Sequence, residues 1–483
     1  MPSVKAIICS AVAGTVGLCA IARGDLAATA PPSGAAVSSN VQMQAKIQAL
    51  EGRINELESQ EARTQADVTA AIHDVLADAD KRSKLMSVAP MEFPTGYDSN
   101  VGFVLQSADG NFSMHPGALF QFRNQTSYRT SIPAGGGGET ASTGTDTQNG
   151  FNISRMRFTV DGNLYSPNLM YYFQVADDNA AGSLSLLDAY VTYRLSSQSP
   201  LAVKFGQFKD PVWHEENVLP GNQLTVDRSL ANAFLGSGQD MRVQGLGLIF
   251  DEDEFRGQAV FHDGYASTNT KFFDAGGLGA GIGAGAGVTP TNWGATVRAE
   301  YMVIGERTPE FNPFSEYDQF SAQGDKQNIL VVGAGADYSE SGSDSIVFHT
   351  LDAQYNTTSG WGIYGAYLGA YRSINSVKGA PLGHFYDSGF LLQAGYMLTS
   401  RFEPFVRYDY THLDGQAVPT VNKDSVQEVT IGANYYFYGQ HAKVTVDGTW
   451  LPNGSPTDVD MLGILKNDGH DELVLQVQFQ LEI

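Results

Sequence analysis

Cysteine is almost absent from the sequence: the 483 residues contain only Cys9 and Cys19, both near the start of the chain. Disulfides therefore cannot stabilise the body of the protein, even in an oxidising compartment. The stability has to come from another source. A closed barrel, in which every strand is hydrogen-bonded on both sides, would provide it.

Positive charge is also scarce, since 29 Lys and Arg stand against 52 Asp and Glu and give a formal net charge of -23. A protein that binds nucleic acid needs a basic surface for the phosphates, so we expect no nucleic-acid partner. Charged residues of both signs make up only 17% of the chain. Soluble globular domains typically carry about 25%.

Long apolar runs are lacking except at the N-terminus. Lys5 precedes an apolar run at 6–22 that ends in small residues, with a favoured cleavage site after Ala22. Glycines interrupt this run, which is short for a membrane-spanning helix. We predict a signal peptide at 1–22 and a linker at 23–40, with an N-terminal membrane anchor as the alternative.

A different pattern begins at Met43, where apolar residues recur at alternating steps of three and four. The residues that form this seam are Ile47, Leu50, Ile54 and Leu57. Such heptads predict a coiled coil, which we place at 41–86. The alternative is one amphipathic helix that packs on its own domain.

Glycine and aromatic residues are abundant, with 53 Gly, 22 Tyr and 26 Phe. After Pro94 the helical period disappears, and apolar and polar residues alternate with the period of two that β-strands show. In the last segment, 472–483, every second residue is apolar up to Ile483; in a membrane barrel this face would contact lipid, and Gln476, Gln478 and Gln480 on the other face would point inward and line water. The pattern predicts about sixteen strands, at roughly 112–127, 150–162, 168–177, 186–196, 200–208, 240–250, 255–263, 292–303, 328–338, 346–356, 360–371, 389–399, 401–411, 427–438, 442–451 and 472–483.

The connections between these strands alternate between short and long. The short ones are 163–167, 197–199, 251–254, 357–359, a break near Ser400, and 439–441; the long ones include 128–149, 209–239, 264–291, 372–388, 412–426 and 452–471. Outer-membrane barrels have short turns at one rim and long loops at the other. The connection 304–327 breaks this order, so either a strand pair is miscounted or a long segment leaves the short-turn rim. We predict an all-β transmembrane barrel of about sixteen antiparallel strands at 97–483, preceded by the α-helical coiled coil.

Several segments of this barrel resemble the phosphate-selective porins O and P. They read "GFVLQSADGNFSMHPGALFQFR", "SRMRFTVDGNLY", "LLDAYVTYRL", "VKFGQFKDP", "GQDMRVQGLGL", "EPFVRYDY" and "IGANYYFYGQHAKV", in this order between residues 102 and 444. The resemblance implies a sixteen-stranded outer-membrane pore, usually a homotrimer, that passes small hydrophilic solutes. In some members it implies phosphate as the solute, with arginines and lysines in the channel.

Charged residues on the inward face of the predicted strands are the candidate pore lining. The cations are Arg123, Arg155, Arg157, Arg194, Lys204, Arg242, Arg298, Arg407 and Lys443; the lumenal acids are Asp188, Glu300, Asp352 and Asp409. In a narrow pore the local charge pattern outweighs the net charge, so anions can pass despite the acid excess.

Arg155 and Arg157 lie two residues apart and therefore point to the same side of one strand. A pair of lumenal arginines can hold phosphate through forked hydrogen bonds. The alternative is that they pair with wall carboxylates, such as Asp188 or Asp409, and only stiffen the barrel.

The long loop at 209–239 is the candidate constriction, because by resemblance to porins generally such a loop folds into the lumen. The candidate constriction residues are Lys209, Glu215, Glu216, Asp227 and Arg228. His214 beside two glutamates lacks the spacing of metal ligands, so we expect no metal and no cofactor. The Gly-rich stretch 276–287 neither follows a βαβ strand nor precedes a helix, which argues against a nucleotide loop.

No set of nucleophile, base and orienting group is apparent, so we expect no enzyme. The sequence predicts an outer-membrane porin of a Gram-negative-type bacterium, in contact with lipid, with its coiled coil in the periplasm. Its solutes are small ions and hydrophilic molecules, with phosphate a candidate through the resemblance alone. The alternative is a structural protein with little conductance, whose coiled coil trimerises the barrel or tethers it to the cell wall.

Overall fold

The structure is a computed structural model of the whole chain. It describes residues 46, 48–53, 56, 96–98, 102–129, 147–178, 182–235, 241–265, 267, 269, 292–308, 311–375, 383–414, 424–455, 462, 464 and 471–483. The chain divides into two units, Met1–Pro90 and Met91–Ile483. In the first unit the described residues, 48–53 among them, are helical; the predicted signal peptide, the linker and most of the coiled coil lie outside the described residues.

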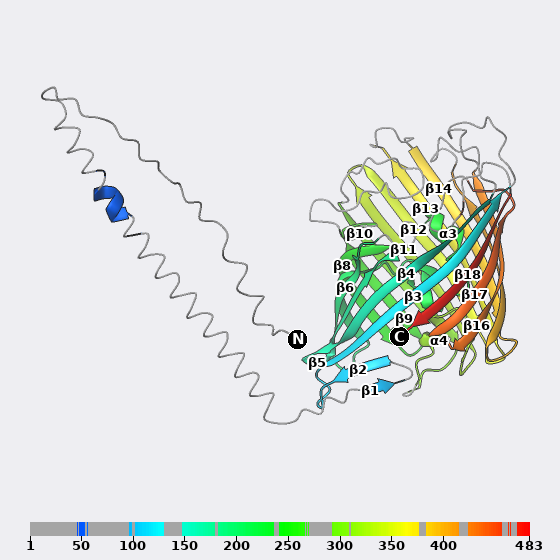
Figure 1. The fold of residues 1–483 in the computed structure, drawn as a ribbon, viewed down its shortest axis with the longest axis horizontal. Coiled ribbons are helices and arrows are strands. Elements are labelled where there is room, and N and C mark those ends of the chain that lie inside the picture. Colours follow the sequence, from blue (N-terminus) through cyan, green and yellow to red (C-terminus); the bar gives the residue numbers. More distant parts are fainter. Residues whose placement is uncertain are drawn as a thin grey trace, which may run out of the picture. The chain divides into compact units, whose positions relative to one another are not determined.

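The second unit is a closed antiparallel barrel (Figure 1). Each strand from β3 onward pairs with the next along the chain, and β18 pairs back to β3, with Phe479 opposite Phe122. Closure removes both sheet edges. The sixteen barrel strands are β3 (Ser113–Arg129), β4 (Thr147–Leu164), β5 (Ser166–Ala176), β6 (Ser185–Arg194), β7 (Leu201–Lys209), β8 (Arg242–Glu252), β9 (Phe255–His262), β10 (Trp293–Ile304), β11 (Ile329–Ser341), β12 (Asp344–Asn356), β13 (Trp361–Ile374), β14 (Gly383–Tyr396), β15 (Phe402–His412), β16 (Ser425–Tyr438), β17 (Ala442–Leu451) and β18 (Glu472–Glu482).

The predicted number and order of barrel strands are confirmed. One boundary differs clearly, because β14 starts at Gly383 and not at 389. The first residues of β14 are of types that are common in turns, but their side chains alternate regularly. Phe385 and Asp387 point inward, and Asp387 pairs with Arg372 of β13. An inward charge in an otherwise polar segment gives no apolar period, so the sequence pattern does not reveal it.

A small hairpin precedes the barrel and was not predicted. It consists of β1 (Gly96–Asp98) and β2 (Gly102–Gln106), and β2 pairs briefly with the start of β3. With three and five residues, these strands are too short to show a period of two.

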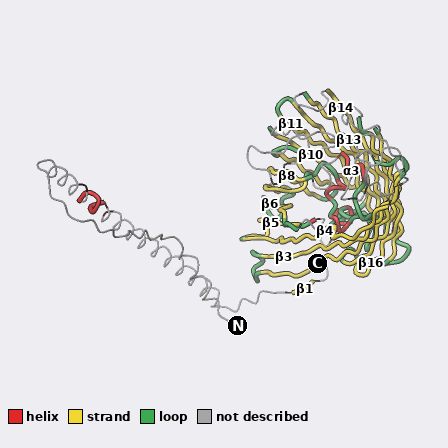
Figure 2. Tube along the Cα trace, turned by 45° about the horizontal axis from the view of Figure 1, so that its top comes forward, coloured by secondary structure: helices red, strands yellow, loops and turns green. Residues whose placement is uncertain are grey.

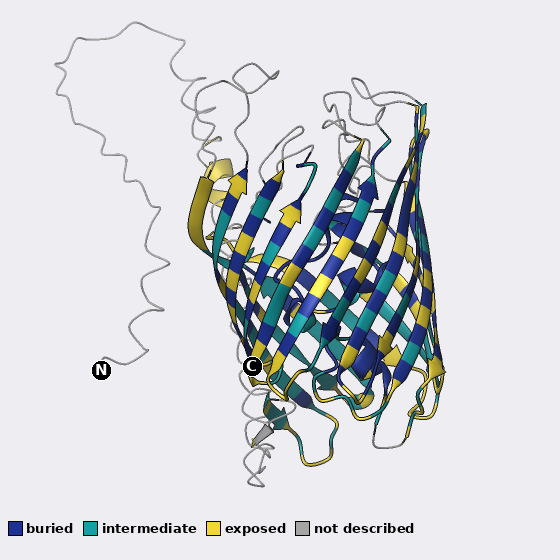
Figure 3. Cartoon of the chain, turned by 90° about the vertical axis from the view of Figure 1, so that its right-hand side faces the viewer, coloured by how far each residue is buried: buried dark blue, intermediate teal, exposed yellow. Residues whose placement is uncertain are grey.

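Exposed and buried residues alternate along most strands, as Figure 3 shows. In β18, Leu475, Val477 and Phe479 are exposed to the outside while the glutamines between them are buried. The same outward apolar face recurs on strands all round the barrel. Such an extensive apolar surface is unstable in water and suits the hydrocarbon core of a membrane. Among the described residues, no helix is long and apolar enough to cross a membrane.

The two rims differ as predicted, with two exceptions. The β11–β12 connection, at the long-loop rim, is a two-residue turn in which Gly342 takes a φ of 61°. At the opposite rim, the segment 305–328 between β10 and β11 is long and carries the short helix α4 (Phe314–Tyr317). The strand count on either side of it is correct, so this segment is a real excursion of the chain.

Candidate pore and its lumenal loops

The connection 210–241 between β7 and β8 folds into the barrel, where its short helices are visible in Figure 2. It contains α2 (His214–Asn217), the 3-10 turn η4 (Pro220–Asn222) and α3 (Leu230–Leu235). Helix α3 packs against the inner side of β13, β14 and β15. The described part of this connection thus lies against the inner wall of the barrel.

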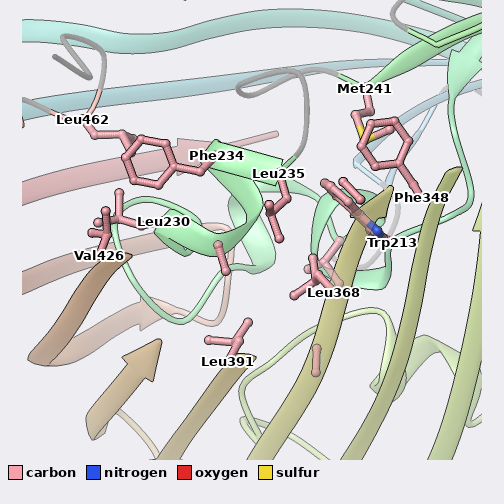
Figure 4. Packing of buried hydrophobic residues seen from close by; sticks show 14 of the residues in the cluster. Trp213, Leu230, Phe234, Leu235, Met241, Phe348, Leu368, Leu391, Val426 and Leu462 are labelled. Atoms are coloured by element: carbon pink, nitrogen blue, oxygen red, sulfur yellow. The ribbon is translucent and has the colours of Figure 1, made fainter. Parts of the chain in front are cut away.

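An apolar cluster inside the barrel holds this loop in place (Figure 4). Trp213 is 1% exposed and packs edge-on against Phe348 of β12, with ring centroids 5.4 Å apart. Gly389 of β14 leaves room for α3, because a Cβ there would lie 3.0 Å from the Cβ of Ala231. An inward glycine at this point thus permits the close approach of helix and wall.

The segment 305–328 enters from the opposite rim and meets the first loop. The rings of Tyr317 and His214 stack with centroids 3.7 Å apart and an interplanar angle of 13°. His214 Nε2 also lies 3.2 Å from the carbonyl oxygen of Tyr317. Burial lowers the pKa of His214, so the ring is neutral in this contact at neutral pH. Ser321 anchors the segment to the wall by donating a hydrogen bond to Glu403.

Two of the candidate pore-lining arginines share one carboxylate of the constriction loop. Arg123 and Arg155 approach Asp227 at 2.7 and 3.4 Å, and all three side chains are almost fully buried. Burial alone would raise the pKa of Asp227, but the two guanidinium charges outweigh it and hold that pKa below its usual range. These arginines therefore clamp the loop to β3 and β4.

Three further wall cations donate to backbone carbonyls of the same loop. Arg298 Nη1 lies 3.2 Å from the oxygen of Val212, and Arg407 Nη1 lies 2.8 Å from that of Asp227. Lys443 Nζ lies 2.9 Å from the oxygen of Gln223. Carbonyl oxygens that face a wall would otherwise be buried without a partner.

Two further candidate arginines pair with acids. Arg157 forms an ion pair with Asp178 beyond the end of β5. Arg242 contacts Asp188 of β6 at 2.8 Å.

The other predicted lumenal acids also have partners. Asp352 and Glu300 lie 2.9 and 2.7 Å from nitrogens of Arg298. Asp409 accepts a hydrogen bond from the first backbone N–H of α3, at Leu230, with a distance of 3.1 Å. Carboxyl oxygens at a helix start satisfy N–H groups that have no partner within the helix.

The charged residues of the constriction loop mainly form hydrogen bonds with other groups of the same loop. Glu215 accepts two hydrogen bonds from Ser229, each 2.7 Å long. Arg228 donates to the carbonyls of Glu215, Glu216 and Val218, and Lys209 donates to that of Glu216. The glutamate side chains next to His214 thus fold the loop back on itself.

The glutamines of β18 point inward as expected but do not face open water. Gln476 donates to Asp227 at 2.9 Å, and Gln480 donates to the carbonyl of Gly221 at 3.1 Å. Gln478 accepts a hydrogen bond from Ser154 at 3.0 Å. The expectation that these side chains line water is wrong, because the loop covers this part of the wall.

Open space lies on the side of the barrel formed by β5 to β8. A hollow of about 390 Å³ near the short-turn rim is lined by the cations Arg194 and Arg307 and by the acids Asp251, Glu252 and Asp253, among others. One step deeper on the same face, Lys204 Nζ lies 4.4 Å from the ring centroid of Tyr190 and 4.3 Å from that of Phe208. In the described part of the chain, Lys204 has no carboxylate within ion-pair distance.

The strand pattern did not single out a second set of inward polar residues at the base of the constriction loop. They are Asp210, His262, Thr296 and Asp337, each at most 2% exposed. Their inward phase on adjacent strands could have revealed three of them. Their meeting with Asp210 depends on the path of the loop, which has no period.

Residues 136–300 match the family model described as phosphate-selective porin O and P. No curated protein sequence matches the chain. Among solved structures, the anion-selective porin from Comamonas acidovorans is similar with a TM-score of 0.52 and 12% identity, over 77% of this chain and all of that one.

Two other solved barrels were found at lower similarity. OprB of Pseudomonas putida has a TM-score of 0.49 and 9% identity, with 78% of this chain and 95% of that chain covered. OmpT of Vibrio cholerae has a TM-score of 0.45 and 11% identity, with 78% and 99% covered. The match over residues 136–300 confirms the resemblance to the phosphate-selective porins O and P, and the chain folds as a porin-type barrel of sixteen strands.

Proposed function

We propose that this protein is an outer-membrane channel through which small hydrophilic solutes and ions diffuse passively. The observation that carries the proposal is the combination of an apolar outer face with a polar lumen that two loops narrow. A barrel that served only as an anchor would need neither a constriction loop nor a hollow beside it. The short-turn rim, to which the N-terminal segment leads, would face the periplasm.

Anions are the solutes that we propose for this space. Most lumenal arginines form ion pairs with buried acids, so they contribute little net field to the open side. Arg194 lines the hollow together with three acids, whereas Lys204, one step deeper, rests on two aromatic rings and has no described carboxylate within ion-pair distance. These two cations, and not the arginine pair of β4, are the proposed anion contacts.

Reversal potentials in asymmetric KCl test this assignment. Lys204→Gln should lower the anion-to-cation permeability ratio about fivefold, because one unit charge at about 4 Å in water is worth about 1 kcal/mol. Arg401→Gln, which removes an exposed cation from the β14–β15 turn, is the matched control and should leave the ratio unchanged. Cation preference of the unaltered protein would refute the anion assignment.

The proposed assembly is a homotrimer, which the resemblance supports; the heptads at 41–86 support self-association without indicating the number of chains. A coiled coil of this length could hold three barrels together or reach the cell wall from the periplasmic side. Either role would leave the path through each barrel in place.

A further inference from the structure

A buried hydrogen-bonded chain joins the base of the constriction loop to three wall strands. Asp210 is the first loop residue after β7, and its Oδ2 lies 3.2 Å from the hydroxyl of Thr296 on β10. That hydroxyl lies 2.8 Å from Oδ2 of Asp337 on β11. His262, the last residue of β9, places Nε2 2.8 Å from the same Oδ2.

The hydrogens of this chain can be assigned from its geometry. His262 Nδ1 accepts a hydrogen bond from the backbone N–H of Gly264 at 3.0 Å, so the hydrogen of the neutral ring is on Nε2 and is donated to Asp337. Thr296 has a single hydroxyl hydrogen to share between the two carboxylates. Every group is satisfied when Asp210 is protonated and donates to Thr296, which in turn donates to Asp337.

The charged side chains around Asp210 do not take the place of the proton on its carboxyl group. Asp210 faces Asp337 from β11 and His262 from β9, while β10 presents the neutral Thr296. The guanidinium of Arg298, further along β10, is directed to Val212, Glu300, Tyr317 and Asp352. The ammonium of Lys209 is directed to Glu216. Asp210 Oδ1 accepts the N–H of Val212, which ties the carboxyl to the loop itself.

We propose that Asp210 is a positioning residue that docks the constriction loop in its protonated form and releases it on ionisation. Ionised Asp210 would leave two buried carboxylates competing for one hydroxyl hydrogen, and such like-charge contacts in a dry site are unfavourable. The strain is relieved when the loop base moves away from β10 and β11. The inference rests on the proposed channel only for its effect on current.

The direction of the pH effect follows from the two states of the loop. Burial first, and then the charge of Asp337, raise the pKa of docked Asp210 to about 7. In a released, hydrated loop the carboxyl has its ordinary pKa of about 3.9. The contribution of Asp210 to docking is therefore complete below about pH 4, weakens by up to about tenfold per pH unit between about 4 and 7, and changes no further above that.

A proton and a metal ion are the two occupants of this site that an experiment can distinguish. Three candidate ligand atoms of Asp210, His262 and Asp337 lie within 4.8 Å of one another, which is also compatible in distance with a metal ion. A metal on Nε2 would move the ring hydrogen to Nδ1, where it would meet the N–H of Gly264. The proton is thus the occupant that this geometry favours.

Acrylamide quenching of tryptophan fluorescence, with full-length protein in detergent, measures docking without relying on conductance. Of the four tryptophans, Trp213 lies three residues from Asp210 and is buried by the docked loop, whereas Trp293, Trp361 and Trp450 are on the outer face. Quenching of Trp213, identified by comparison with Trp213→Phe, should rise between about pH 4 and pH 7.

Asp210→Asn keeps the shape of the side chain and carries a permanent donor for Thr296, so its quenching should stay low across this range. Asp263→Asn, which alters an exposed acid next to His262, is the matched control. It should keep the step, that is, the rise in quenching between about pH 4 and pH 7. Thr296→Val, which removes the bridging hydroxyl, should be quenched strongly even at pH 4.

Two results would overturn the inference. One is a step that persists in Asp210→Asn; the other is a step that EDTA shifts and Zn²⁺ restores, which would assign the site to a metal. In bilayers, current that rises over the same pH range would link the loop to conduction. A silent protein with the fluorescence step intact would count against the proposed channel and leave the docking mechanism standing.

Discussion

At the scale of single residues, most inward arginines of this barrel bind the lumenal loops to the barrel wall. Arg123 and Arg155 both contact Asp227, which lies in the loop and not in the wall. The period of two in β3 and β4 correctly predicted the face on which these arginines lie. It could not predict their partner, because the approach of Asp227 is set by the fold of a loop about a hundred residues away in sequence.

Removal of the Asp227 charge should release this part of the loop. Asp227→Asn leaves two buried guanidinium groups without their carboxylate, which typically costs about 3–5 kcal/mol of local stability. We expect trypsin to cleave after the normally buried Arg228 in this variant while the barrel stays intact. Asp161→Asn, in which the lost carboxylate is 46% exposed, is the control and should resist cleavage.

Acid should produce the same release in the unaltered protein. The pKa of Asp227 lies below its usual range, so its contribution to docking is complete above about pH 4 and is lost as the pH falls through the lowered pKa. Trypsin is inactive at such a low pH, so pepsin is used, and its cleavage within 210–241 is measured. Protection that persists at pH 2 would show that the arginines do not depend on this carboxylate.

At the scale of elements, the strands could be predicted from the sequence and the lumenal segments could not. A strand with one face in lipid and one in the lumen has a strong period of two, and most of the barrel strands have it, β11, β12 and β18 among them. The segment 305–328 has no period, because its residues contact neighbours on different elements. Tyr317, for example, stacks on His214 of the constriction loop, whereas Ser321 donates a hydrogen bond to Glu403 of β15.

Excision of this segment should widen the channel. Replacement of 306–327 by Gly-Asn would restore an ordinary short turn between β10 and β11 and remove Tyr317 from the lumen. We expect a barrel that still inserts and conducts a larger current per channel. The same dipeptide in place of 439–441, at the β16–β17 turn of the same rim, should not change the current. Equal currents in both variants would mean that the segment lies outside the path.

At the scale of the whole molecule, the low charge content and the acid excess no longer conflict with an anion path. The buried cations and acids of the lumen are largely paired with each other or with loop carbonyls. The field in the open space on the β5 to β8 side then depends on a few groups: Lys204, Arg194 and Arg307 are positive, and Asp251, Glu252 and Asp253 are negative. The composition alone could not indicate this, because it does not separate paired charges from unpaired ones.

Single-channel recording of the purified protein in planar bilayers tests the central claim most directly. The account predicts steady, stepwise currents that scale with salt concentration, as expected of a water-filled path beside the constriction loop. A correctly folded, heat-stable barrel that inserts and stays silent between pH 4 and pH 8 would contradict it. Such a protein would be a structural component of the envelope whose loops close the barrel.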